Sequence, residues 1–158
     1  MKKGLLAGVS LLTGAVAGAA AMGKFKGQAV DAQIEKVDKF KGYYNMLNQW
    51  LILKQEGKSL VEYFVNNHYK SVAIYGMGEM GNRLYDELKN SDIEVKYAID
   101  KNVAGTYSEL EVIEKDDDFD VVDVMIVTAT FAFDEIEGEL REKVDWPIVS
   151  LEDVVYEI

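Results

Sequence analysis

The chain has 158 residues, of which 49% are apolar, enough for one globular domain and an appended segment. It contains no cysteine, which excludes disulfides, thiolate metal sites and cysteine nucleophiles. His68 is the only histidine, and no second metal-binding residue pairs with it in the sequence, so we expect no metal cofactor. Residues 1–70 carry a net charge of +5 and residues 71–158 a net charge of −16; because so acidic a C-terminal part repels phosphate backbones, we expect no nucleic-acid partner.

Residues 1–23 have the features of a membrane anchor. Two lysines precede residues 4–23, an uncharged run that is rich in Gly, Ala, Leu and Val and long enough for one membrane-spanning helix. More lysines follow the run than precede it, so the positive-inside rule places the rest of the chain in the cytoplasm. The basic start and the small residues Ala17–Ala21 also fit a signal peptide, whose cleavage would export the rest. We expect an uncleaved anchor that binds the membrane through residues 4–23, with export after signal cleavage as the alternative.

Residues 24–69 are predicted to be a helical linker region. Apolar side chains approximate a helical period over residues 29–55, most densely at Tyr43–Ile52. Gly42 predicts a kink or a break in this helix, and Gly57 predicts its end. The favoured interpretation is that the apolar face covers the rest of the protein, because such stripes are usually core. The other interpretation is a surface for self-association or for a protein partner.

The stretch Ser71–Gly81, SVAIYGMGEMG, predicts a buried strand, a glycine-rich turn and the start of a helix. Gly76, Gly78 and Gly81 have the G-x-G-x-x-G spacing of dinucleotide-binding turns. The first glycine permits the tight turn, the second lets the backbone approach a pyrophosphate, and the third lets the helix pack close to the strand. The start of the helix then offers unpaired N–H groups to the phosphates. This pattern predicts a nucleotide-binding domain over residues 70–158.

A second predicted strand, Val95–Ile99, supplies an acid for the same site. Asp100 follows this strand, at a position where its carboxylate can accept a hydrogen bond from a ribose 2′-hydroxyl. A 2′-phosphate would face this carboxylate, so NAD is favoured over NADP. Glu79 lies within the phosphate turn, where an acid suits the bare helix dipole but opposes a bound anion.

The remaining residues predict three more strands, at Leu110–Ile113, Val121–Thr128 and Ile148–Val149. The charged stretch between the first two leaves room for a crossover helix of one turn or for none. Asp134 and Ser150 are predicted to cap the last two helices. We therefore expect an α/β fold: a small doubly wound parallel sheet of about five strands in the order 3-2-1-4-5, preceded by a membrane helix and a helical linker.

The segments IYGMGEMG, VKYAID, VMIVTA and PIVSLEDVV resemble the small Rossmann domains of bacterial surface-polysaccharide biosynthesis proteins, which include membrane-linked nucleotide-sugar epimerases and dehydratases. The resemblance covers about residues 70–156 and implies NAD(P) or a nucleotide sugar as the ligand. It implies that Gly76, Gly78 and Gly81 form a phosphate loop, which is lined by Met77, Glu79 and Met80. It also implies that the Asp100 carboxylate contacts the adenosine ribose. Three further residues are implied to lie near the distal part of the ligand: Thr128, Ala129 and Thr130.

Three alternative functions are consistent with this sequence. The first is a membrane-tethered nucleotide-binding accessory or sensor module. The second is a protein-interaction module whose Rossmann fold has lost its ligand, which Glu79, the acidic surface and the apolar helix at residues 29–55 favour. The third is an enzyme that needs a partner protein. No catalytic acid, base or metal cluster is evident, so we name no catalytic residue and expect no independent catalytic activity.

Overall fold

A computed structural model of the chain describes residues 30, 31, 33–103 and 109–158. These residues fall into two units, one that ends at Tyr43 and one that comprises Tyr44–Ile158. The anchor predicted at residues 4–23 lies outside the described residues. Among the helices that the structure describes, none has the length and apolar character needed to cross a bilayer.

The first helix covers residues 33–55. Its helical assignment continues through Gly42, so the break that this glycine suggested does not occur. Within the Tyr44–Ile158 unit, one face of the helix is buried. The buried side chains on that face are those of Met46, Trp50 and Leu53. These three residues cover the α/β domain, but the apolar stripe predicted from the sequence to do so is exposed at Tyr44, Leu47 and Leu51. The favoured interpretation is therefore wrong for that stripe, because the helix packs through a different face.

Residues with a positive φ angle end the helices that lead to the sheet. Gly57 has a φ of +79° and ends the first helix as predicted, because the Lys58 N–H donates to the Leu53 carbonyl at 2.9 Å. Helix α2, Val61–Asn66, is followed by His68, whose φ is +61°. The single histidine therefore lies just past a helix end and before the first strand.

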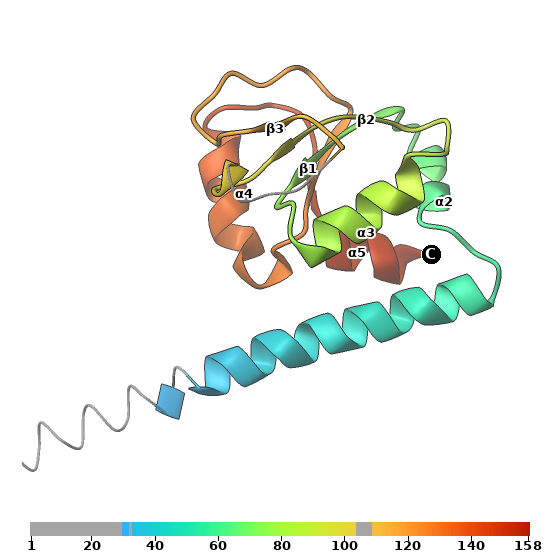
Figure 1. The fold of residues 1–158 in the computed structure, drawn as a ribbon, viewed down its shortest axis with the longest axis vertical. Helices are drawn as coiled ribbons and strands as arrows, with labels where there is room; N and C mark the ends of the chain where they lie inside the picture. The colour runs from blue at the N-terminus through green and yellow to red at the C-terminus, as the bar shows by residue number, and fades with distance from the viewer. Residues whose placement is uncertain (1–29, 32, 104–108) are drawn as a thin grey trace, which may run out of the picture. The chain divides into compact units, whose positions relative to one another are not determined.

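Five parallel strands form one sheet in the order β3-β2-β1-β4-β5 (Figure 1). The strands are β1 Ser71–Tyr75, β2 Glu94–Ile99, β3 Val112–Ile113, β4 Val124–Val127 and β5 Ile148–Ser150. β1 lies between β2 and β4, and both β1 and β4 are almost wholly buried, as expected for parallel strands with both faces covered. The α/β class, the parallel pairing and the predicted order 3-2-1-4-5 are confirmed.

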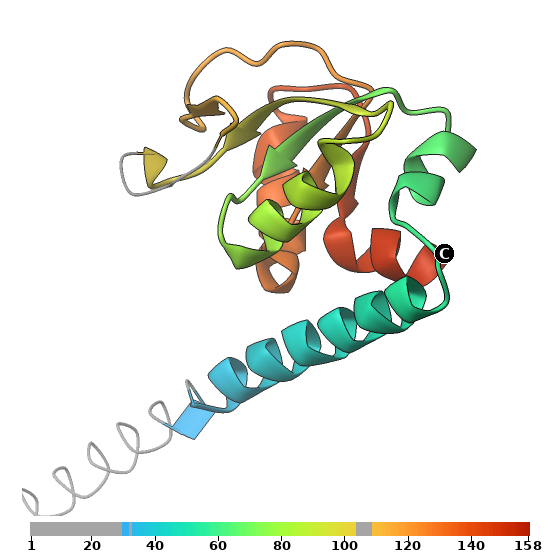
Figure 2. The same ribbon diagram turned by 45° about the vertical axis from the view of Figure 1, so that its right-hand side comes forward.

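Helices cover both faces of this sheet (Figure 1, Figure 2). They are α3 Glu79–Leu88, α4 Phe133–Arg141 and α5 Leu151–Glu157, and a 3₁₀ turn, η2 Thr130–Ala132, precedes α4. α4 packs through Ile136 and Leu140 on the face that Tyr75 lines, and α3 and α5 lie on the opposite face. The crossover from β3 to β4, residues 114–123, contains no helix, so the crossover helix is missing rather than shortened.

The two predicted helix caps have different outcomes. Ser150 caps α5, since its Oγ accepts a hydrogen bond from the Glu152 N–H at 3.2 Å. The prediction that Asp134 caps α4 is wrong, because the cap position is Ala132 and Asp134 lies within the first turn. The η2 turn runs directly into α4, so no extended residue precedes the helix. Asp134 still places a negative charge at the positive end of the helix dipole.

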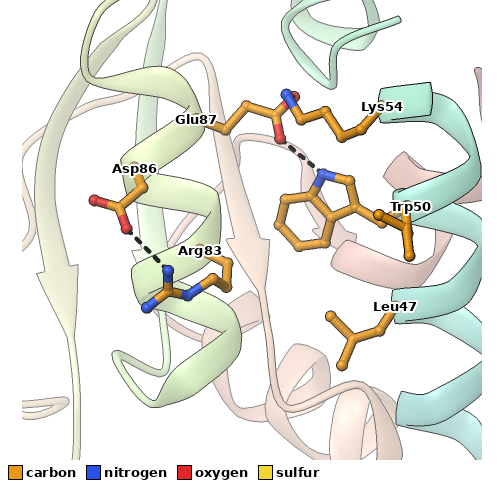
Figure 3. Close-up of a pocket in the computed structure, with 7 residues that line it drawn as sticks. Leu47, Trp50, Lys54, Arg83, Asp86 and Glu87 are labelled. Carbon is orange, nitrogen blue, oxygen red and sulfur yellow. Dashed lines mark hydrogen bonds and ion pairs between the residues drawn. The ribbon is translucent and has the colours of Figure 1, made fainter. Parts of the chain in front are cut away.

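Glu87 on α3 joins the sheet domain to the segment that precedes it (Figure 3). Its side chain is only 5% exposed, and Trp50 Nε1 donates to one carboxylate oxygen at 2.7 Å. The other oxygen accepts from Ser59 Oγ and the Leu60 N–H at 2.9 and 2.8 Å, and lies 2.6 Å from Lys54 Nζ. Burial opposes ionisation, but these hydrogen bonds together outweigh it and lower the pKa of the Glu87 carboxyl.

Replacing Glu87 with glutamine is expected to lower the free energy of unfolding by roughly 3 kcal/mol at pH 7, because the buried cluster loses its negative charge and one of its two acceptor oxygens. The folded-state pKa of Glu87 is below its unfolded value, so its contribution is complete above the unfolded pKa of about 4.3 and is lost as the pH falls through the folded value. Urea unfolding of both proteins at pH 7 and pH 3.5 measures this, and the difference between them should shrink at the lower pH.

Asp86→Asn is the matched control for this prediction. Asp86 neighbours Glu87, but its side chain is 45% exposed and pairs only at the surface with Arg83 and Lys89. The control should change the free energy of unfolding much less than Glu87→Gln does, because exposed ion pairs contribute little. Equal losses in the two variants would show that Glu87 has no special role in holding the helix to the sheet.

Candidate functional site

The glycine turn begins at Gly76, immediately after β1. Gly76 has a φ of +95°, and its N–H donates to the Ile99 carbonyl at the end of β2 at 2.7 Å. A Cβ on Gly76 would lie 2.7 Å from Thr128 Oγ1, which is closer than real Cβ contacts. Both the backbone conformation and the space therefore require glycine at this position.

The fold requires glycine at position 81 but not at position 78. A Cβ on Gly81, in the first turn of α3, would collide with the carbonyl of Gly76, so this glycine lets the helix pack against the turn. Gly78 is exposed, its φ is −73°, and a Cβ built on it would meet no atom within 4 Å. Of the three glycines in the motif, Gly78 is the one at which neither the backbone conformation nor the packing in the described structure requires a glycine.

Asp100 lies at the end of β2 and holds the turn from that side. One carboxylate oxygen accepts from the Met77 N–H at 2.8 Å, and the other accepts from the Asn102 N–H at 2.9 Å. Each oxygen of a carboxylate has a second acceptor position, so Asp100 retains the capacity to accept from a hydroxyl group. The structure therefore fixes the carboxylate beside the glycine turn, where the sequence placed it.

Asn82 also stabilises the turn, and the sequence did not single it out. Its side-chain amide donates to the carbonyls of Met77 and Gly78 at 3.1 and 3.0 Å. These bonds hold the two carbonyls toward the helix. An asparagine one position after the last glycine was the available signal, because a short amide at a helix start readily bonds to nearby backbone groups.

Thr128, Ala129 and Thr130 follow β4 at the same edge of the sheet. Thr128 is 4% exposed, and its hydroxyl donates to the Gly76 carbonyl at 2.7 Å, so it holds the glycine turn from the side opposite Asp100. Ala129 and Thr130 are half-buried at the start of η2. Their predicted approach to the distal part of a ligand stays a prediction.

The three residues predicted to line the phosphate loop occupy different environments. Met77 is 3% exposed and its sulfur lies beside Gly81, so its side chain is core and only its backbone faces the turn. Glu79 is exposed in the first turn of α3, and Met80 is half-buried. The groups that the turn offers to an anion are therefore backbone N–H groups at the start of a ten-residue helix.

Tyr75, the residue before the turn, carries a polar group that the described structure leaves without a partner. Its side chain is 4% exposed on the α4 face, and no described atom hydrogen-bonds to the phenol oxygen. Burial raises the pKa of the Tyr75 phenol. A buried hydroxyl without a partner is costly, and such groups are unusual outside sites with a special role.

The glycines of the turn predict a contrast in stability. Gly81→Ala should lower the free energy of unfolding by roughly 3 kcal/mol or more, because its Cβ would collide with backbone that cannot move easily. Gly78→Ala should change it by about 1 kcal/mol or less, since a weaker helix cap is offset by a less flexible unfolded chain. Chemical denaturation of both variants measures the contrast. Similar losses in the two would contradict the assignment of Gly78 as structurally dispensable.

Comparison of the chain with protein-family models, with curated proteins and with solved structures gives no match. Within the part of the chain that the structure describes, no three His, Cys, Asp or Glu side chains are grouped so that they could hold a metal ion.

Proposed function

We propose that the protein is a nucleotide-binding module whose site is the glycine turn between β1 and α3. The observation that carries this proposal is Gly78, which the fold does not require and which leaves open space where a Cβ would stand. A glycine at this point of the turn suits a pyrophosphate that contacts the backbone directly. The neighbouring N–H groups at the start of α3 suit the same ligand, because they offer hydrogen bonds and a positive dipole end.

The ligand class that we propose is NAD or a nucleotide sugar. Asp100 stands at the end of β2 with acceptor capacity left, which suits a ribose bearing free hydroxyl groups. A 2′-phosphate would bring two further negative charges to this carboxylate, so NAD is favoured over NADP. The described turn contains one acidic residue, Glu79. The affinity of the turn for an anion therefore rests on backbone N–H groups rather than on basic side chains.

A protein-interaction module without a ligand is the second candidate. Glu79 favours it, since its exposed carboxylate already lies in the first turn of α3 and opposes a bound phosphate. The exposed apolar side chains of the first helix also favour it. Attachment to the membrane through residues 4–23, with the α/β domain in the cytoplasm, remains a prediction from the sequence.

Binding is tested by thermal unfolding of the full chain in mild detergent, with NAD, NADP and a uridine-diphosphate sugar each added separately. A ligand at 100 times its dissociation constant should raise the free energy of unfolding by about 2.7 kcal/mol, a shift of several degrees for a chain of this size. The proposal predicts such a shift with NAD or the nucleotide sugar and a smaller one, or none, with NADP.

Gly78→Val is the variant that connects the shift to the turn. Its side chain occupies the open space at Gly78, so the ligand shift should disappear while the protein without ligand stays folded. Asn45→Ala, an exposed change on the first helix, should leave the shift intact. If no nucleotide stabilises the wild-type chain, or if Gly78→Val retains the full shift, the proposed site is wrong.

A further inference from the structure

The last residue of β1, Tyr75, carries a buried hydroxyl group that no contact in the described structure uses. Its side chain is 4% exposed, and the phenol oxygen has no hydrogen-bond partner among the described residues. A phenol can donate one hydrogen bond and can also accept, so both capacities are left over. Because the next residue is Gly76, this hydroxyl belongs to the strand end from which the glycine turn starts.

A second buried tyrosine on the same face of the sheet shows how the protein itself can satisfy such a group. Tyr97 on β2 is also 4% exposed, and it belongs to the same apolar cluster as Tyr75. Its hydroxyl donates to the Asp120 carbonyl at 2.7 Å. The crossover from β3 to β4 therefore supplies an acceptor for Tyr97, whereas no described residue supplies one for Tyr75.

Charged side chains lie near the Tyr75 hydroxyl. Burial raises the pKa of the Tyr75 phenol, and the positive charge of Lys115 opposes this rise. Three carboxylates raise the same pKa further, those of Glu139, Asp100 and Glu135. Negative charges therefore outnumber positive ones around the hydroxyl. A neutral group that both donates and accepts hydrogen bonds suits these surroundings better than a phosphate does.

An exposed ion pair beside this hydroxyl joins the end of β3 to α4. The Lys115 Nζ and Glu139 Oε2 atoms are 2.7 Å apart. The two side chains are 34% and 42% exposed, whereas the Tyr75 phenol oxygen is buried. Ion pairs as exposed as this one contribute little to stability, so the two side chains can separate at small cost.

We propose that the Tyr75 hydroxyl binds a sugar hydroxyl of the nucleotide and thereby gains the partner that the described residues do not supply. This inference rests on the proposed nucleotide site, since the glycine turn that follows Tyr75 would hold the phosphates of the same ligand. The Lys115–Glu139 pair separates to admit the sugar. The ribose of NAD and the hexose of a nucleotide sugar offer the same chemistry here, namely neutral hydroxyl groups.

Tyr75→Phe tests this subsite, because it removes the hydroxyl and keeps the ring. Without ligand, the variant should unfold at the temperature of the wild-type chain or above it, since a buried group without a partner is removed. Its dissociation constant for NAD or for uridine-diphosphate glucose, measured by calorimetry on the full chain in mild detergent, should rise about fivefold or more. Weakening with NAD assigns the contact to a ribose, and weakening with uridine-diphosphate glucose alone assigns it to the hexose.

Tyr97→Phe is the matched control. It removes an equally buried hydroxyl from the same face of the sheet, but one that has an acceptor in the protein, so it should lower the unfolding temperature and leave nucleotide binding unchanged. If Tyr75→Phe also lowers the unfolding temperature, its hydroxyl already has a partner and the subsite is wrong. Wild-type affinity of Tyr75→Phe for both ligands would overturn the subsite alone. A wild-type chain that binds neither ligand would overturn the proposed function, and the subsite with it.

Discussion

The site depends on hydrogen bonds that reach the glycine turn from both neighbours of β1. From β2, the Ile99 carbonyl accepts from the Gly76 N–H and the Asp100 carboxylate accepts from the Met77 N–H. From β4, the Thr128 hydroxyl donates to the Gly76 carbonyl. Because β2 and β4 flank β1, the strand order itself brings these groups together. The hydrogen bonds of the sheet's own residues therefore hold the turn.

We propose that this arrangement lets an acidic domain bind an anionic ligand. The domain as a whole repels negative charge, since residues 71–158 carry −16, and residues 76–81 include no arginine or lysine. Backbone N–H groups that are already oriented need no reorganisation when a phosphate binds. In the proposed site, Asp100 would orient the ligand rather than attract it, because a carboxylate favours hydroxyl groups over a further phosphate. Recognition on this account rests on geometry, with Gly78 leaving the approach open.

The fold was largely predictable from local patterns, and the missed features are long-range. Apolar runs and the glycine motif located the strands, and the crossover rule gave their order. The strand predicted from Val121 begins at Val124, because an apolar run does not show which residues pair with a neighbour. The contacts of Glu87 join residues 27 to 37 positions apart, which no sequence spacing reveals. The roles of Asn82 and Thr128 depend on where the carbonyls of Gly76, Met77 and Gly78 point.

The most direct measurement is the response of the backbone amides of residues 78–81 to NAD, followed by NMR on the ¹⁵N-labelled full chain in detergent. The account predicts that these amide signals shift with a saturable dependence on concentration, together with that of Asn102 beside Asp100. It also predicts that amides of α4, on the opposite face of the sheet, stay in place. Unchanged signals at residues 78–81 at saturating nucleotide would contradict the claim that this turn is a binding site.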